Sequence, residues 1–173
     1  MFIAMLACLL PSPTHATVPE FPILMGAQMM LVSFSTISEN QQLLGELPTR
    51  EMRRRLAAYL TRRLKEENLP VVVEEMGRSH ILPAGVLQHN VVSVFVRADL
   101  ANTAVDEHQT TIGAVGILLN RESSSSAEYY LSHKPMTFFV VEGDQADLED
   151  KVLGAAQDQI EISVIGPLVL LLR

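Results

Sequence analysis

Seven of the thirteen Lys and Arg residues in this chain lie within sixteen consecutive positions, 50–65. Apolar side chains recur at every fourth position of the same stretch, which places them on one face of a helix. These apolar residues are Met52, Leu56, Leu60 and Leu64. The pattern predicts an amphipathic helix that docks its apolar stripe on a core and directs its cations outward. Such a helix needs a sheet or other helices to pack against, so it already indicates a folded domain.

The flanking residues predict where this helix begins and ends. Thr49 follows Pro48 and is expected to cap the first turn. Asn68 and Pro70 are expected to end the helix, because Asn tolerates the left-handed conformation that closes many helices and Pro cannot continue one.

Composition indicates one globular domain with an acidic surface. The chain has 173 residues, of which 48% are hydrophobic and 19% charged, which is enough to bury a core without disulfides or metal. Its net charge is −7, and positions 50–65 hold seven cations and one acid, so the remainder is −13. A general nucleic-acid binder needs a basic surface, so no nucleic-acid partner is expected.

Residues 1–16 have the pattern of an export signal. An uninterrupted apolar run at residues 2–10 precedes Pro11, and the following Thr14, His15 and Ala16 approximate a cleavage site. No cation precedes this run, so an uncleaved apolar N-terminus stays an alternative. Another is a lipoprotein with Cys8 acylated. Cys8 is the only cysteine, so cleavage after Ala16 leaves no thiol for disulfides, catalysis or zinc.

The remaining pattern predicts a single α/β domain over residues 17–173. We expect an α+β fold, with a mostly antiparallel sheet of about five strands and two helices packed on one face. The expected strands are 28–36, 71–75, 88–98, 110–119 and 129–141, the last interrupted around 132–135. A polar turn is expected at 100–109. A second helix is expected from residue 146 to about 163, and Gly166 and Pro167 are expected to break any helix that reaches them.

The first half of the domain resembles the opening of small exported bacterial α/β domains. In that group a strand and a polar loop lead into a helix of the form L-x3-L-x3-L and then through a G-I/L-x-V-V link into the next strand. Leu56, Leu60 and Leu64 match the helix, and residues 68–72 match the link, with Asn68 where Gly is usual. The group includes the amino-terminal domain of TolB and CsgG-like envelope lipoproteins. The resemblance implies a non-enzymatic envelope component that binds protein or aids assembly, with no catalytic residues to transfer.

The cations of the predicted helix are the candidate binding residues. Guanidinium groups pair with phosphate and carboxylate, so this face is suited to an anionic lipid surface or an acidic partner. The alternative is a solvated face neutralised by the protein's own acids, such as the neighbouring Glu66 and Glu67. The candidate residues are Arg53, Arg54, Arg55, Arg62, Arg63 and Lys65.

No catalytic, metal or cofactor site is expected from motif spacing. Asp106, Glu107 and His108 are adjacent and, with His80 and His89, offer ligands for a metal or acid/base site. Adjacent residues on a strand point in alternate directions, however, and no metal-binding spacing is present. The four serines at 123–126 read as a flexible loop, and no cofactor is predicted.

Together these features favour a periplasmic or exported envelope component that binds a protein partner through a sheet edge or through the arginine-rich helix. Two alternatives stay open. One is a small metal-dependent or acid/base enzyme built around His80, His89, Asp106 and His108, and the other is a module that binds anionic surfaces through the helix.

Overall fold

The computed structural model describes residues 22–38, 47–77, 82–105, 108–122, 127–131, 136–142 and 144–172. The predicted signal at 1–16, Cys8, His80, Asp106, Glu107 and the serines at 123–126 lie outside these residues. The described strands are β1 Met29–Ser38, β2 Val72–Glu75, β3 Val91–Val105, β4 His108–Glu122, β5 Ala127–Leu131 and β6 Thr137–Glu142. The helices are η1 Pro22–Leu24, α1 Thr49–Glu66, η2 Gln88–Asn90, α2 Gln145–Ile160, η3 Glu161–Ile165 and α3 Gly166–Leu172.

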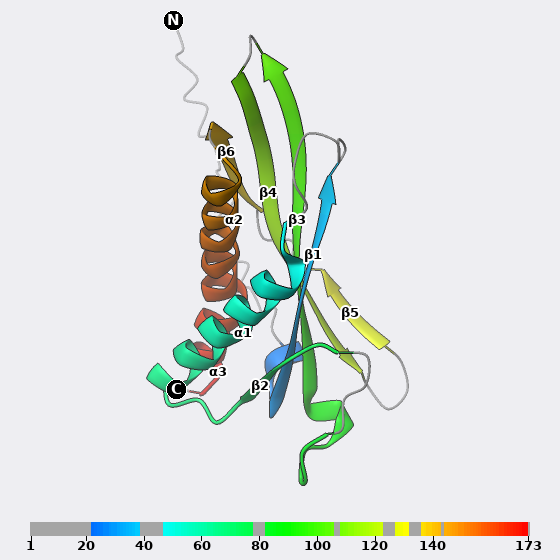
Figure 1. The fold of residues 1–173 in the computed structure, drawn as a ribbon. Coiled ribbons are helices and arrows are strands. Elements are labelled where there is room, and N and C mark those ends of the chain that lie inside the picture. The colour runs from blue at the N-terminus through cyan, green and yellow to red at the C-terminus, as the bar shows by residue number, and fades with distance from the viewer. Residues whose placement is uncertain are drawn as a thin grey trace, which may run out of the picture.

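These elements form one mixed sheet with helices on one side, which confirms the α+β class (Figure 1). Six strands occupy five positions in the order β2-β1-β3-β4-β5, and β6 also pairs with β4. Because β3 takes one edge of β4, β5 and β6 both pair with the other edge, as Leu118↔Leu131 and Val115↔Thr137 show. The predicted interruption of the last strand is therefore confirmed.

The strands are not all antiparallel. The β3–β4, β4–β5 and β4–β6 pairings are antiparallel, as expected of successive neighbours, but β1 pairs in parallel with both β2 and β3. The physical reason for the first parallel pairing is the crossover through α1, which returns the chain to the end of the sheet where β1 began.

The two long helices cover the same face of the sheet. Alternate residues of β1, β3 and β4 point at them and form one buried cluster with the apolar stripes of α1 and α2. The predicted stripe of α1 is buried throughout, with Met52, Leu56 and Leu60 at 0% exposure and Leu64 at 1%. From α2 the cluster takes Leu148, Val152, Ala156 and Ile160. No described helix covers the opposite face of the sheet.

The sequence predicted the C-terminal end of α1 correctly but not its N-terminal cap. Thr49 is the first helical residue and Pro48 the N-cap, and no side chain caps this end, so the predicted Thr49 cap is wrong. At the other end Asn68 has φ +57, as its type allows. The Leu69 amide donates to the Leu64 carbonyl and the Asn68 amide to the Lys65 carbonyl, which is a Schellman closure.

The C-terminal helix continues where the sequence predicted a break. A wide π-helical turn, η3, follows α2, and the Gly166 amide donates to the Glu161 carbonyl five residues earlier. Pro167 then lies in the first turn of α3, where a missing amide hydrogen is tolerated. Glycine fits this junction closely, because a Cβ there would lie 3.1 Å from the Glu161 carbonyl oxygen. The chain from Gly166 to Leu172 is therefore helical, and the predicted break is wrong.

Strands β3 and β4 are longer than predicted and replace the polar turn expected at 100–109. Their ladder runs from Val92↔Arg121 to Val105↔His108. Ala98 and Leu100 are buried against the helices. This packing favours the strand conformation in a part of β3 whose sequence is more polar.

Gly113 in β4 makes room for an aromatic ring from β6. A Cβ at Gly113 would lie 2.2 Å from Cζ of Phe139 and 2.9 Å from Cδ2 of Leu100. Gly113 and Phe139 are direct cross-strand partners, so the ring lies over the glycine on the helix-covered face. The absence of a side chain at this position therefore sets how β6 packs on β4.

We predict that Gly113→Ala lowers the free energy of unfolding by about 1–3 kcal/mol, because the new methyl group displaces the Phe139 ring. Chemical denaturation followed by circular dichroism measures this. Gly154→Ala in α2 is the matched control, since its Cβ meets nothing within 4 Å, and it should stabilise the protein by about 0.5–1 kcal/mol. An equal cost for Gly113→Ala in a Phe139→Ala background would contradict the proposed cause.

Candidate protein-interaction surface

The arginine face of α1 is paired with the protein's own carboxylates. Arg53 contacts Glu75 of β2 at 3.2 Å, and Arg55 contacts Asp150 of α2 at 3.5 Å. Within the helix Arg54 pairs with Glu51 and Arg62 with Glu66. Lys65 is exposed and makes no ion pair with any described residue.

Arg63 belongs to a cluster that ties α1 to the C-terminal helices. Its Nε donates to Oε1 of Glu161 at 2.7 Å, and its Nη2 donates to Oε2 at 3.2 Å. The Tyr59 hydroxyl donates to the same Oε1 at 2.8 Å. Arg63 also pairs with Glu66 and Glu67, and the Arg62 guanidinium lies 5.4 Å from the centre of the Tyr59 ring.

The electrostatics of this cluster follow from its contacts. Hydrogen bonds from Arg63 hold the pKa of the Glu161 carboxyl below its ordinary value, although partial burial opposes this. Burial, followed by the hydrogen bond to Glu161 and its charge, raises the pKa of Tyr59 to about 12. The Arg63 pKa is raised by its hydrogen bonds to Glu161 and Glu66. Arg63 thus acts as an internal clamp, and an external anion would have to displace these carboxylates.

Of the candidate metal ligands, His89 and His108 are described, and they lie far apart. Arg121, near the C-terminal end of β4, donates from Nε to the backbone carbonyl of His89. His89 therefore lies beside the C-terminal end of β4. His108 begins β4, thirteen positions earlier. Since a strand rises about 3.3 Å per residue, roughly 40 Å separates the two histidines. Among the described residues no three His, Cys, Asp or Glu side chains gather as metal ligands.

The sheet face opposite the helices carries an apolar patch, which we call the open-face patch. Phe138 and Val140 of β6 are 72% and 57% exposed, and three neighbours are exposed between 38% and 48%. Ala114↔Phe138 and Ile112↔Val140 are cross-strand pairs, so their side chains lie next to one another on this face. The five members are Ile37, Ile112, Met136, Phe138 and Val140.

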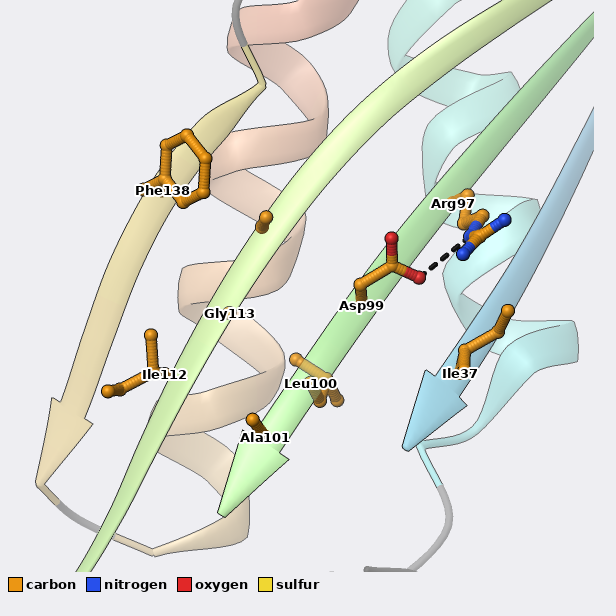
Figure 2. Close-up of a pocket in the computed structure, with 9 residues that line it drawn as sticks. Ile37, Arg97, Asp99, Leu100, Ala101, Ile112, Gly113 and Phe138 are labelled. Atoms are coloured by element: carbon orange, nitrogen blue, oxygen red, sulfur yellow. Dashed lines mark hydrogen bonds and ion pairs between the residues drawn. The ribbon is translucent and has the colours of Figure 1, made fainter. Parts of the chain in front are cut away.

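A shallow hollow of about 370 Å³ lies within this surface, between β1 and β6 (Figure 2). Small residues, Ala101 of β3 and Ala114 of β4, line it. Arg97 and Asp99 stand at its side, with Arg97 Nε donating to Asp99 Oδ1 at 2.7 Å. Figure 2 shows this ion pair and Phe138 on opposite sides of the hollow. The arrangement combines an apolar floor, an aromatic rim and a pre-formed charge pair.

The same face is covered at its other end. Met29 and Leu31 of β1 and Val91 of β3 form a second buried cluster. Three residues from the connection between β2 and η2 pack on it, namely Met76, Leu82 and Val86. The patch therefore lies at the end of this face that no described segment covers.

Sequence reasoning missed this patch because it placed the binding site on α1. The run TFFVVE at 137–142 was recognised as strand, but apolar residues on both of its faces do not reveal which face the helices cover. The available signal was the excess of apolar residues on an edge strand that needs only one buried face.

Comparisons with known proteins add structural neighbours only. No protein-family model and no curated protein matches the chain. A homolog of a neuraminyllactose-binding hemagglutinin from Helicobacter pylori aligns over 84% of each chain, with 11% identity and a TM-score of 0.40. An uncharacterised protein aligns over 81% of this chain and 92% of its own, with 13% identity and a TM-score of 0.40.

The hypothetical protein CT253 from Chlamydia trachomatis aligns over 82% of this chain and 98% of its own, with 9% identity and a TM-score of 0.44. Scores this low carry no argument about function. The resemblance to TolB and CsgG-like domains stays a prediction. Among the described helices, none has the length and apolar character needed to cross a membrane.

We predict that Tyr59 ionises near pH 12. Its folded pKa lies above the ordinary value of 10.0, so its contribution to stability is complete below pH 10 and is lost as pH rises through about 12. Ultraviolet titration of tyrosinate measures this, and Tyr59→Phe should remove the late step. A titration of Tyr59→Phe that matches the wild type would contradict the assignment.

The stability contributed by Glu161 depends on pH in the opposite direction to that of Tyr59. Its folded pKa lies below the ordinary 4.5, so its contribution is present above that pH and is lost as pH falls through the folded value. We predict that Glu161→Gln is less stable than the wild type at neutral pH and that this difference shrinks in acid. Urea unfolding across the acid range measures it, and a constant difference would contradict the prediction.

Proposed function

We propose that this protein is a non-enzymatic component of the cell envelope that binds a protein partner on the open-face patch. One observation carries the proposal: five large apolar side chains are gathered around a shallow hollow on the sheet face that no described helix covers. Contiguous exposed apolar surface rimmed by polar groups is typical of protein-interaction sites. The envelope location rests on the apolar segment and cleavage pattern at residues 1–16.

The composition of the patch supports a protein as the partner. Phe138 is a rigid aromatic with few rotatable bonds, so ordering it on binding costs little entropy. Arg97 and Asp99 lie beside it already paired, and such rim charges give orientation more than affinity. The hollow is open and shallow, whereas small-molecule sites bury most of their ligand.

The arginine helix is not part of this proposed site. Each of its five candidate arginines contacts a carboxylate of the same chain, so the helix has little free positive charge to offer an anionic surface. The open-face patch therefore takes its place as the proposed binding surface.

We predict that Phe138→Asp weakens partner binding by about 30-fold, because aromatic anchors of this kind contribute about 2 kcal/mol or more. The full-length tagged protein would be used to isolate partners from its own cells. Each partner would then be purified, and its affinity for wild type and variants measured by calorimetry.

Ala58→Asp is the control, since Ala58 is exposed on α1, away from the patch. It introduces the same charge and should leave affinity unchanged. Both variants should stay folded and lose at most about 1 kcal/mol of stability, because neither position is buried and only secondary-structure propensity changes. A purified partner that binds Phe138→Asp as tightly as the wild type would overturn the proposal.

A further inference from the structure

Strand β6 ends the sheet with an unpaired edge. Within the described part of the chain it pairs only with β4, so its outer amide and carbonyl groups face no other strand. Natural edges are usually blunted by proline, lysine or inward-pointing charge. The sequence TFFVVE has none of these, and its only charge is the terminal Glu142. β6 thus keeps the features of a strand that can accept a further strand.

A groove runs between this strand and α2. Its volume is about 480 Å³, and Thr137 and Phe139 form the β6 wall. Asp147, Lys151 and Asp158 line the α2 wall. Gly154 lies in the same wall, and a Cβ there would meet nothing within 4 Å, so the groove is open at this point. There is room beside β6 for side chains from an added strand.

The groove is acidic. Its lining residues include three aspartates, Asp147, Asp150 and Asp158, and one lysine, Lys151. Asp150 contacts Arg55 of α1, but Asp147 and Asp158 make no ion pair with any described residue. These two carboxylates lie about three turns apart along α2. A strand laid along β6 would therefore pass Asp147 and Asp158, with Lys151 as the one cation in the same wall.

We propose that an extended segment of the partner protein, with alternating basic and apolar residues, adds to the outer edge of β6. The backbone pairs with β6, since added strands take their affinity from main-chain hydrogen bonds. Because side chains alternate between faces, basic residues enter the acidic groove while apolar residues continue the open-face patch beside Phe138 and Val140. This inference rests on the proposed function and names the chemistry of the partner.

A second copy of this chain does not fit the edge as well. Pairing of β6 with β6 of a second molecule uses the same surface twice, so it brings two acidic grooves together. The β6 sequence also has no cation to place beside Asp147 or Asp158. Like charges at an interface oppose association, whereas a basic strand neutralises them.

The test uses peptides on the full-length protein. The probe is a six-residue peptide of alternating lysine and valine, which matches the length of β6. Two matched controls are the same peptide with glutamate for lysine and the lysine peptide N-methylated along one edge, which keeps charge but blocks strand pairing. Binding would be followed by shifts in backbone amide resonances and quantified by titration.

The lysine peptide should shift amide resonances of β6 and bind at least about tenfold more tightly than the glutamate peptide. N-methylation should abolish binding, and added salt should weaken it. Asp147→Asn combined with Asp158→Asn should weaken binding by about tenfold. Glu149→Gln is the matched control. Glu149 does not line the groove, so this substitution should leave peptide binding unchanged.

Three outcomes overturn the inference: equal binding of the lysine and glutamate peptides, no shift of β6 resonances up to the solubility limit, or a dimer in which β6 pairs with β6. The proposed function is judged separately, by the effect of Phe138→Asp on the purified native partner. Loss of that binding without any peptide binding would leave the function standing and remove only the strand-addition mode.

Discussion

The packing of both long helices on one face of the sheet is the constraint on which the other features depend (Figure 1). Leu56 and Leu60 of α1 and Val152 and Ala156 of α2 meet alternate residues of β1, β3 and β4, and no described helix covers the opposite face. Burial of this one layer supplies the main favourable free energy, since apolar surface removed from water contributes about 25 cal/mol per Å². On the opposite face, Met76, Leu82 and Val86 cover one end, and the open-face patch is exposed at the other.

The charge distribution follows from the same packing. The cations concentrated in α1 face acids that come from β2, α2 and η3, so the helix is neutralised by contacts across the fold. Glu161 is the most connected of these acids, because it accepts from both Tyr59 and Arg63 at the π-helical turn. The arginines of α1 are engaged by carboxylates of the same chain, whereas Asp147 and Asp158 of α2, which line the groove, make no ion pair with any described residue. The groove beside β6 thus carries more acids than bases, although the most conspicuous sequence feature is basic.

The sequence predicted the elements whose signals are local. The stripe of Leu56, Leu60 and Leu64 fixed the helix and its buried face, and Asn68 fixed its end, because periodicity and left-handed closure depend on neighbouring residues. The parallel pairing of β1 depends on partners tens of residues away, and the helical path through Pro167 depends on a π-helical turn that local propensity does not encode. The site was missed for the same reason: the exposure of Phe138 is decided by which face the helices cover, and the carboxylates that engage Arg53 and Arg63 lie far along the chain.

Adjacent phenylalanines connect the fold to the proposed site. Phe139 packs over Gly113 on the covered face, and this contact fixes the register of β6 on β4. Because the side-chain period of a strand is two, a slip of one residue would turn Phe138 inward and Phe139 outward. The glycine that accommodates one ring therefore holds the other in its exposed position before any partner arrives. An anchor held in this way loses little freedom on binding, which is the condition under which a small apolar patch contributes useful affinity.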